Sequence, residues 1–92
     1  MAKQKFVIGR LLITPGVQNL FKETKEDLLQ YVNRHAMGDW GNCSAKDKKQ
    51  NDLAVILGER IFSRYDTKDG TALWIITEAS RSYTTVLLPR EY

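Results

Sequence analysis

The sequence predicts a single α+β domain spanning 1–92, in which an antiparallel sheet carries helices on one face. Three observations support this fold class. The stretch 60–89 has the pattern of three consecutive strands, a strand-forming run lies at 5–13, and two helical patterns fill the segment between them. The predicted order is therefore β-α-α-β-β-β, and 92 residues suffice for one modest core.

The stretch 60–89 carries its own strand and turn signals. Its dipeptide at 69–70 is Asp-Gly, which favours a tight hairpin turn because glycine adopts positive φ without steric cost. The run 72–76 is apolar at both alternating positions, so we expect a strand covered on both sides. Turn residues at 79–82 precede the β-branched and apolar run 83–88, and Pro89 ends pairing. These signals predict an antiparallel meander.

Helix signals occupy the region between the strands. Thr14 favours a short helical turn after the first strand, and Thr24 is predicted to cap a helix with an apolar stripe that ends before Gly38. Ser44 is predicted to cap a further helix, ended by Gly58, whose first turns are polar. The residues of this helix expected to dock on the core are Leu53, Ala54, Ile56 and Leu57.

Composition indicates the cellular compartment of the protein and excludes some kinds of site. The single cysteine, Cys43, excludes an internal disulfide and is typical of the reducing cytoplasm. No apolar run approaches the roughly 20 residues that cross a bilayer. One histidine and one cysteine cannot form a thiolate–imidazole zinc site. We therefore expect a cytoplasmic protein without a membrane, metal or cofactor, and its net charge of +3 permits contact with nucleic acid without requiring it.

The loop Asp39-Trp40 and the nearby His35 form the first candidate site. Trp40 lies between flexible glycine-containing segments, so it either plugs the end of the core or stacks on a base or a partner side chain. Asp39 either caps the preceding helix turn or takes part in that recognition. His35 is either a packing residue at a helix end or an acid–base group, because its unperturbed pKa lies near neutrality.

A second cluster of polar residues lies on the predicted meander. Its members either form cross-strand salt bridges on solvated edges or bind a phosphodiester for metal-free RNA cleavage. In the second interpretation arginines neutralise the phosphate and Glu78 acts as general base, with His35 or a tyrosine assisting. Alternation along the strand places Arg60 and Arg64 on one face with Phe62. The residues of the cluster are Arg60, Arg64, Tyr65, Glu78, Arg81, Ser82 and Thr84.

Four sequence blocks, TPG, GDWG, GERIFSRY and WIITEASRSYTTVLLPREY, together resemble a family of small bacterial proteins that are plasmid-related and associated with mobile elements. The resemblance implies a mobile-element setting rather than a mechanism. In many members the second turn reads E-A-D-R-S, whereas Ser80 stands in place of the acid here. The predicted element order also resembles that of RelE/barnase-like toxin nucleases, which implies RNA cleavage by residues on a meander sheet.

Three functions follow from these observations. The leading prediction is a non-enzymatic interaction protein, an inhibitor or adaptor that binds a host or element protein; a homodimer through an open sheet edge is one form this interaction can take. The alternative is an RNA-directed protein such as a metal-independent ribonuclease. The third is a DNA-binding regulator whose polar helix would place lysines on phosphates, namely Lys46, Lys48 and Lys49.

Overall fold

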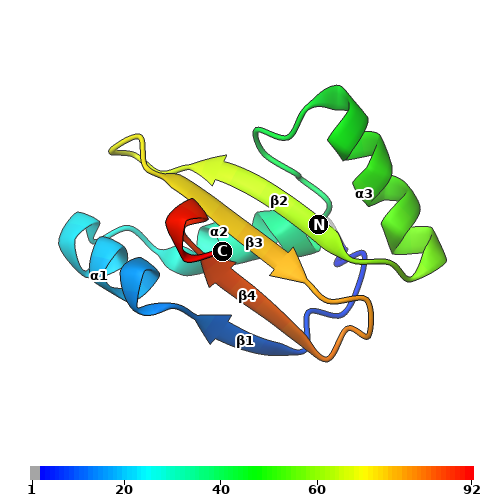
Figure 1. The fold of residues 1–92 in the computed structure, drawn as a ribbon, viewed down its shortest axis with the longest axis horizontal. Coiled ribbons are helices and arrows are strands. Elements are labelled where there is room, and N and C mark those ends of the chain that lie inside the picture. The colour runs from blue at the N-terminus through cyan, green and yellow to red at the C-terminus, as the bar shows by residue number, and fades with distance from the viewer. Residues whose placement is uncertain (1–2) are drawn as a thin grey trace.

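Four strands form one sheet in the order β1-β4-β3-β2 in the computed structural model, which describes residues 3–92 (Figure 1). The chain is thus an α+β protein, as the sequence predicts. Strands β2, β3 and β4 pair antiparallel in succession, so the predicted meander is confirmed. The strand bounds are β1 Arg10–Ile13, β2 Ile61–Asp66, β3 Ala72–Thr77 and β4 Tyr83–Leu87.

The expectation of a purely antiparallel sheet is wrong, because β1 pairs parallel with β4. Leu11 lies opposite Thr84, and Ile13 lies opposite Val86. The direction of a strand relative to its neighbour depends on the path of the chain between them. The residue pattern of β1 does not indicate that path. The strand also begins at Arg10 rather than at residue 5, because Gly9 at φ +65° turns the backbone against the carbonyl groups of the 81–82 turn.

Three α-helices, rather than two, precede the meander, and a short 3-10 helix follows it. Thr14 caps the first helix by accepting from Val17 N at 3.4 Å, so the predicted helical turn is in fact ten residues long. The second helix is capped by Asp27 and not by Thr24, which belongs to the first helix. Ser44 and Gly58 bound the third helix as predicted. The bounds are α1 Pro15–Thr24, α2 Leu28–Ala36, α3 Ala45–Leu57 and η1 Pro89–Glu91.

The core lies between the sheet and helices α1 and α2; in Figure 1 α2 lies behind the sheet and α1 lies at its left end. Val17 from α1 and Val32 from α2 pack there against Leu73, Ile75 and Val86 of the central strands. Helix α3 lies beyond the β2 edge of the sheet and closes a second, smaller cluster (Figure 1). The buried members of that cluster are Phe6, Trp40, Cys43, Ala54 and Ile61.

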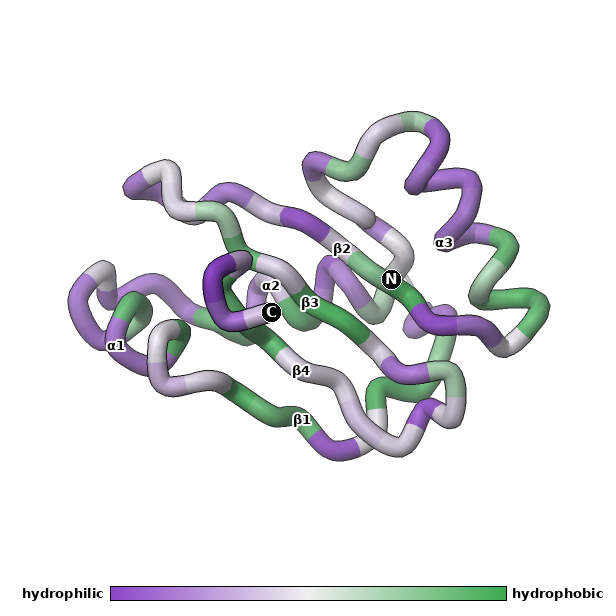
Figure 2. The backbone as a smooth tube through the Cα atoms, in the orientation of Figure 1, coloured by the Kyte–Doolittle hydropathy of each residue, from purple (hydrophilic) through white to green (hydrophobic). Residues whose placement is uncertain are grey.

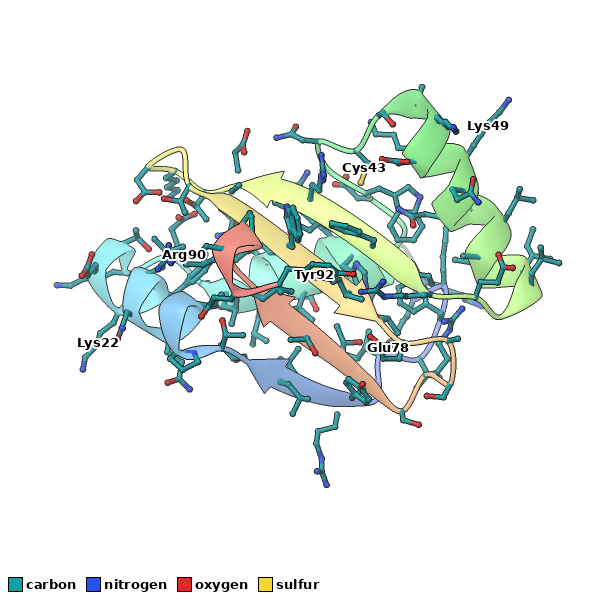
Figure 3. All side chains as sticks on the ribbon, in the orientation of Figure 1. Lys22, Cys43, Lys49, Glu78, Arg90 and Tyr92 are labelled. Carbon is teal, nitrogen blue, oxygen red and sulfur yellow. The ribbon has the colours of Figure 1, made fainter. Side chains whose placement is uncertain are left out.

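Alternation along the strands gives the sheet two different faces. The face toward α1 and α2 is buried. The opposite face carries Phe62 and Arg64 from β2 and Trp74 from β3, and the C-terminal segment with Tyr92 passes over it (Figure 3). This second face is where the sheet displays large side chains to solvent.

Candidate functional site

Two arginines and three aromatic rings form one surface on the face of the sheet opposite α1 and α2. We call it the arginine–aromatic surface, and it consists of Arg60, Phe62, Arg64, Trp74 and Tyr92. The first three members occupy alternate positions at and along β2, which places them on one face. Register then sets Arg64 directly opposite Trp74 on β3.

The rings of this surface touch one another. The ring centroids of Phe62 and Trp74 lie 4.9 Å apart, and those of Trp74 and Tyr92 lie 5.6 Å apart. The guanidinium of Arg64 lies 5.4 Å from the Phe62 centroid and 5.3 Å from that of Trp74, while that of Arg60 lies 5.5 Å from Tyr92. These are distances at which a cation is attracted to an aromatic face.

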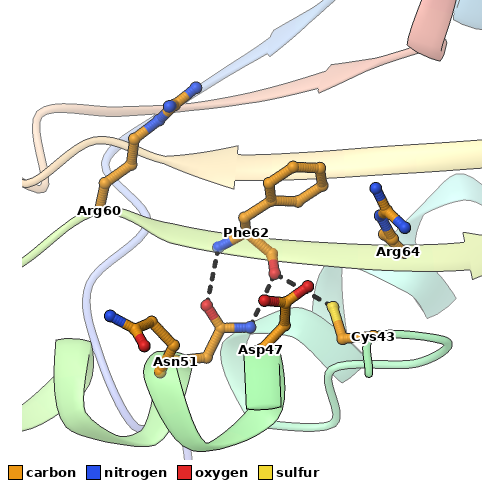
Figure 4. Close-up of a pocket in the computed structure, with 7 residues that line it drawn as sticks. Cys43, Asp47, Asn51, Arg60, Phe62 and Arg64 are labelled. Carbon is orange, nitrogen blue, oxygen red and sulfur yellow. Dashed lines mark hydrogen bonds between the residues drawn. The ribbon is translucent and has the colours of Figure 1, made fainter. Parts of the chain in front are cut away.

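A groove of about 230 Å³ separates the arginine–aromatic surface from α3 (Figure 4). On its α3 side, Asn51 accepts from the Phe62 N–H at 3.1 Å and donates to the Phe62 carbonyl at 2.7 Å. The thiol of Cys43 also donates to that carbonyl, at 3.4 Å. Asn51 thereby acts as an extra strand partner and closes the edge of β2 at this position.

His35 lies at the centre of a buried hydrogen-bond relay on the helix-covered face of the sheet. Its Nδ1 meets the Ser63 hydroxyl, and its Nε2 lies 2.8 Å from Thr77 Oγ1. Thr77 Oγ1 lies 2.6 Å from Thr84 Oγ1, which donates to the Ile8 carbonyl at 2.7 Å. The relay therefore joins α2, three strands and the N-terminal segment.

The directions of these hydrogen bonds assign the tautomer of His35. The Ile8 carbonyl can only accept, so the single proton of Thr84 is used there, and Thr77 must donate to Thr84. Thr77 then accepts from the Nε2–H of His35, and Nδ1 accepts from Ser63. Burial lowers the pKa of His35 from 6.5 to about 3, with a further contribution from the positive charge of Arg81.

The guanidinium group of Arg81 donates hydrogen bonds to three backbone carbonyl groups. One terminal nitrogen donates to Glu59 O at 2.6 Å and to Glu78 O at 3.1 Å, and the other donates to Ala54 O at 3.0 Å. The Ala54 carbonyl belongs to the last turn of α3, where positive charge is favourable. Arg81 thus fastens the C-terminal end of α3 to the turn between β3 and β4.

In the Asp39-Trp40 loop the tryptophan packs inward and the aspartate stays exposed. Trp40 is only 4% exposed, and its indole N–H donates to Asp52 at 2.9 Å, which matches the interpretation that it plugs the end of the core. Asp39 pairs with Arg34 at 2.7 Å, and this hydrogen bond lowers the pKa of Asp39. Tyr65 is buried, donates to the Asp39 carbonyl at 2.6 Å, and has a pKa raised by that burial.

The structure brings some of the predicted site residues together and separates others. Arg60 and Glu78 form an ion pair at 3.8 Å beside the hydroxyl of Tyr92. Arg64 lies on the same face, next to Phe62. His35 and Thr84 belong instead to the buried relay on the opposite face, so the proposed catalytic residues do not share one cleft.

An apolar patch lies on α3, at residues expected from the sequence to dock on the core. Only Ala54 does so, whereas Leu53 is 53%, Ile56 78% and Leu57 64% exposed. We call these three the α3 apolar patch, and Figure 2 shows it as the hydrophobic end of an otherwise hydrophilic helix. The expectation is wrong because α3 lies beside the sheet rather than across it, so a single narrow stripe of α3 meets the core (Figure 1).

Three members of the arginine–aromatic surface, Phe62, Trp74 and Tyr92, are not among the candidate site residues predicted from the sequence. Trp74 sits in a continuous apolar run, where no local pattern indicates that one face is open. Tyr92 lies beyond the last strand, and its packing on Trp74 depends on the turn made by η1. The alternation of Arg60, Phe62 and Arg64 was the available signal, because it repeats a cation–aromatic–cation pattern along one strand face.

Comparisons of the chain with protein-family models, with curated protein sequences and with solved structures found no match. Within residues 3–92, no three side chains of His, Cys, Asp or Glu gather as a metal site requires. Over the same residues, the helices are too short or too polar to cross a membrane.

Proposed function

We propose that this protein is a non-enzymatic interaction protein that binds a partner protein through the α3 apolar patch. The observation that supports this is the exposure of three large aliphatic side chains at positions i, i+3 and i+4 of one helix. That spacing is typical of a helix that inserts its apolar stripe into a groove of another protein. Burying one such side chain fully stabilises a complex by about 1.5–3 kcal/mol.

The charged residues of α3 indicate the chemistry of the partner groove. Successive spacings of three, four and three residues separate Lys46, Lys49, Leu53 and Ile56, so all four lie along one side of the helix. The expected partner therefore offers an apolar groove with acidic side chains at one end. The resemblance to mobile-element proteins favours a host or element protein, and an inhibitor or adaptor role.

The contacts of the expected catalytic residues favour binding over catalysis. His35 is buried with its pKa at about 3, so its imidazole is neutral and both ring nitrogens are engaged. Arg81 is bound to three carbonyl groups. These side chains stabilise the fold in a way that leaves them poorly placed to exchange protons with a substrate.

The test compares the wild type with Leu53→Ser/Ile56→Ser and with Leu12→Ser, which changes an exposed leucine on β1. Light scattering after size exclusion first establishes whether the wild type self-associates, through α3 or through the β1 edge. Affinity capture from a bacterial host extract follows, with the captured protein then purified and titrated. We expect the wild type and Leu12→Ser to bind it and the double variant to lose at least about tenfold in affinity. Equal binding by the double variant would contradict the proposal.

A metal-independent ribonuclease is the second candidate, favoured by the Arg60–Glu78 ion pair beside the Tyr92 hydroxyl. In this function Glu78 would accept the proton of the RNA 2′-hydroxyl while Arg60 neutralises the phosphate; the 2′-oxygen would bond to phosphorus as the bond to the 5′-oxygen breaks, and that oxygen would take a proton from water. Incubation with total RNA in EDTA tests it, with Glu78→Gln as the inactive variant and Glu59→Gln as the matched control. Cleavage that survives Glu78→Gln would exclude this role for Glu78.

A further inference from the structure

The arginine–aromatic surface combines exposed aromatic rings with guanidinium groups that lie close to them. It presents aromatic rings in mutual contact, with Tyr92 68% exposed, and it places two guanidinium groups within 5.5 Å of those rings. We propose that this surface binds single-stranded nucleic acid, with bases packed against Trp74 and Tyr92 and phosphates bound by Arg60 and Arg64. This inference goes beyond the proposed protein partner, because it concerns a different surface.

The rings form one continuous aromatic surface rather than a parallel stack, because the planes of Phe62 and Trp74 are inclined at 60° and those of Trp74 and Tyr92 at 68°. Trp74 lies at the centre, with Phe62 at 4.9 Å on one side and Tyr92 at 5.6 Å on the other, so the aromatic surface continues across β2, β3 and the C-terminal segment. Bases in a single strand offer both of their π faces, whereas bases in a duplex are already stacked on each other. A sheet that presents aromatic side chains in this way suits an unpaired strand.

Charge supports the same ligand. In the described part of the chain Arg64 forms no ion pair, and its guanidinium is held over Phe62 and Trp74 at 5.4 and 5.3 Å. Arg60 is held by Tyr92 and by a long ion pair of 3.8 Å with Glu78, which a phosphate can replace. Arginine binds phosphate through its planar fork and stacks on bases, so it serves both parts of a nucleotide.

Backbone hydrogen bonds also fix the two strands that carry the arginine–aromatic surface. The β2 edge beside it is held at Phe62 by the two hydrogen bonds from Asn51 and at Arg64 by contacts with the loop at 40–42. Trp74 belongs to β3, which pairs on both sides. The rings therefore start from fixed backbone positions, and little ordering entropy is lost when a base packs on them.

The test is fluorescence anisotropy with labelled oligouridylate and oligothymidylate of about ten nucleotides, and with a duplex of the same length. Quenching of tryptophan fluorescence gives a second readout that reports on Trp74, because Trp40 is buried. The variants are Arg64→Ala, Tyr92→Ala and Arg64→Lys. The control is Lys22→Ala, which removes one exposed charge from α1. Circular dichroism verifies that each variant is folded.

We expect the wild type to bind single strands more tightly than the duplex and Tyr92→Ala to weaken binding about tenfold, as loss of one stacked base would. Two phosphate contacts predict that affinity falls about sevenfold between 50 and 200 mM salt. Arg64→Lys should retain the salt dependence but lose stacking, and Leu53→Ser/Ile56→Ser should bind like the wild type. Preference for uridylate or thymidylate identifies RNA or DNA as the source of the strand.

Three results would overturn the inference. The first is absence of binding to any oligonucleotide, which would leave this surface to a protein partner. The second is an equal loss of affinity in Lys22→Ala and Arg64→Ala, which would indicate general charge attraction. The third is binding that keeps its affinity in Tyr92→Ala and Arg64→Ala together.

Discussion

The Nε2 atom of His35 on α2 donates a 2.8 Å hydrogen bond to the hydroxyl of Thr77 on β3, across the buried interface between helix and sheet. Each neighbour of this pair is also fixed, by Ser63 on one side and Thr84 on the other. A histidine in such a position contributes to stability only in its neutral form, because a second ring proton would place an uncompensated positive charge in the core. The most direct prediction concerns pH.

The free energy of unfolding should fall as pH decreases from about 6.5 toward 3. The pKa of His35 is about 3 in the folded protein and 6.5 in the unfolded chain, so below pH 6.5 the unfolded chain binds the extra proton. The contribution of His35 to the free energy of unfolding is thus fully present above pH 6.5. It is lost as the pH falls toward 3, by up to about 1.4 kcal/mol per pH unit. Urea titrations at several pH values measure it. In His35→Asn the slope between about pH 5 and 6.5 should disappear, and an unchanged slope would contradict the assignment.

Replacing Arg81 should loosen the C-terminal end of α3. Arg81→Ala removes the side-chain hydrogen bonds to the carbonyl groups of Ala54, Glu59 and Glu78, of which Ala54 and Glu78 keep backbone donors, and we expect a loss of about 1.5–3 kcal/mol. Arg81→Lys should recover only part of this loss. A single ammonium group cannot bond at once to the Ala54 carbonyl of α3 and to the carbonyl groups of Glu59 and Glu78. Urea unfolding gives the values, and Arg10→Ala, an exposed arginine on β1, is the control that should stay near wild type.

Replacing Asn51 should expose the β2 edge. Asn51→Leu removes both hydrogen bonds to the Phe62 backbone, and we expect a loss of about 1–3 kcal/mol together with a greater tendency to associate. Thermal unfolding and light scattering measure the two effects. Gln50→Ala changes the exposed neighbour on the same helix and should alter neither. A monomeric Asn51→Leu with wild-type stability would show that the edge needs no such partner.

Gly41 and Gly58 should respond differently to alanine. Both have positive φ, +66° and +73°, but a Cβ on Gly41 would meet the Arg64 carbonyl and the Tyr65 ring, whereas nothing lies within 4 Å at Gly58. Gly58→Ala should cost about 1 kcal/mol, the strain of the left-handed conformation. Gly41→Ala adds a backbone clash and should cost at least about 3 kcal/mol. Equal losses in denaturant titrations would contradict the close approach of these segments.

Local signals predict the elements that depend on local chemistry. The meander follows from strand-forming runs and turn residues, and the caps at Ser44 and Gly58 follow from side-chain and backbone preferences. The parallel pairing of β1 is not predictable in the same way, because nothing in four strand residues records the direction of their partner. The cap predicted at Thr24 is wrong because Thr24 is the last residue of α1, and the helix is ended by its C-cap Lys25, whose φ of +58° is uncommon for a residue with a side chain.

The candidate site is less predictable than the fold. Alternation alone places Arg60, Phe62 and Arg64 on one face, and the structure has them there. The surface as a whole needs the register that sets Arg64 against Trp74 and the η1 turn that brings in Tyr92, and both are tertiary facts. For Arg81 and His35 the residue type alone marks a candidate, but only the structure gives the partners of each side chain.

The pairing of β1 with β4 also has a consequence for biosynthesis. On the ribosome β1 is translated before every other strand, while the strand it pairs with is the last of the sheet to emerge. The hydrogen bond of 2.6 Å from Thr14 to Glu91 closes the same distant pair of segments. The meander can assemble from segments that are close in the sequence. The backbone of β1 has no strand partner until β4 has been translated. A nascent chain stalled before that point would therefore carry an unpaired strand edge, which is a site for pairing with other chains.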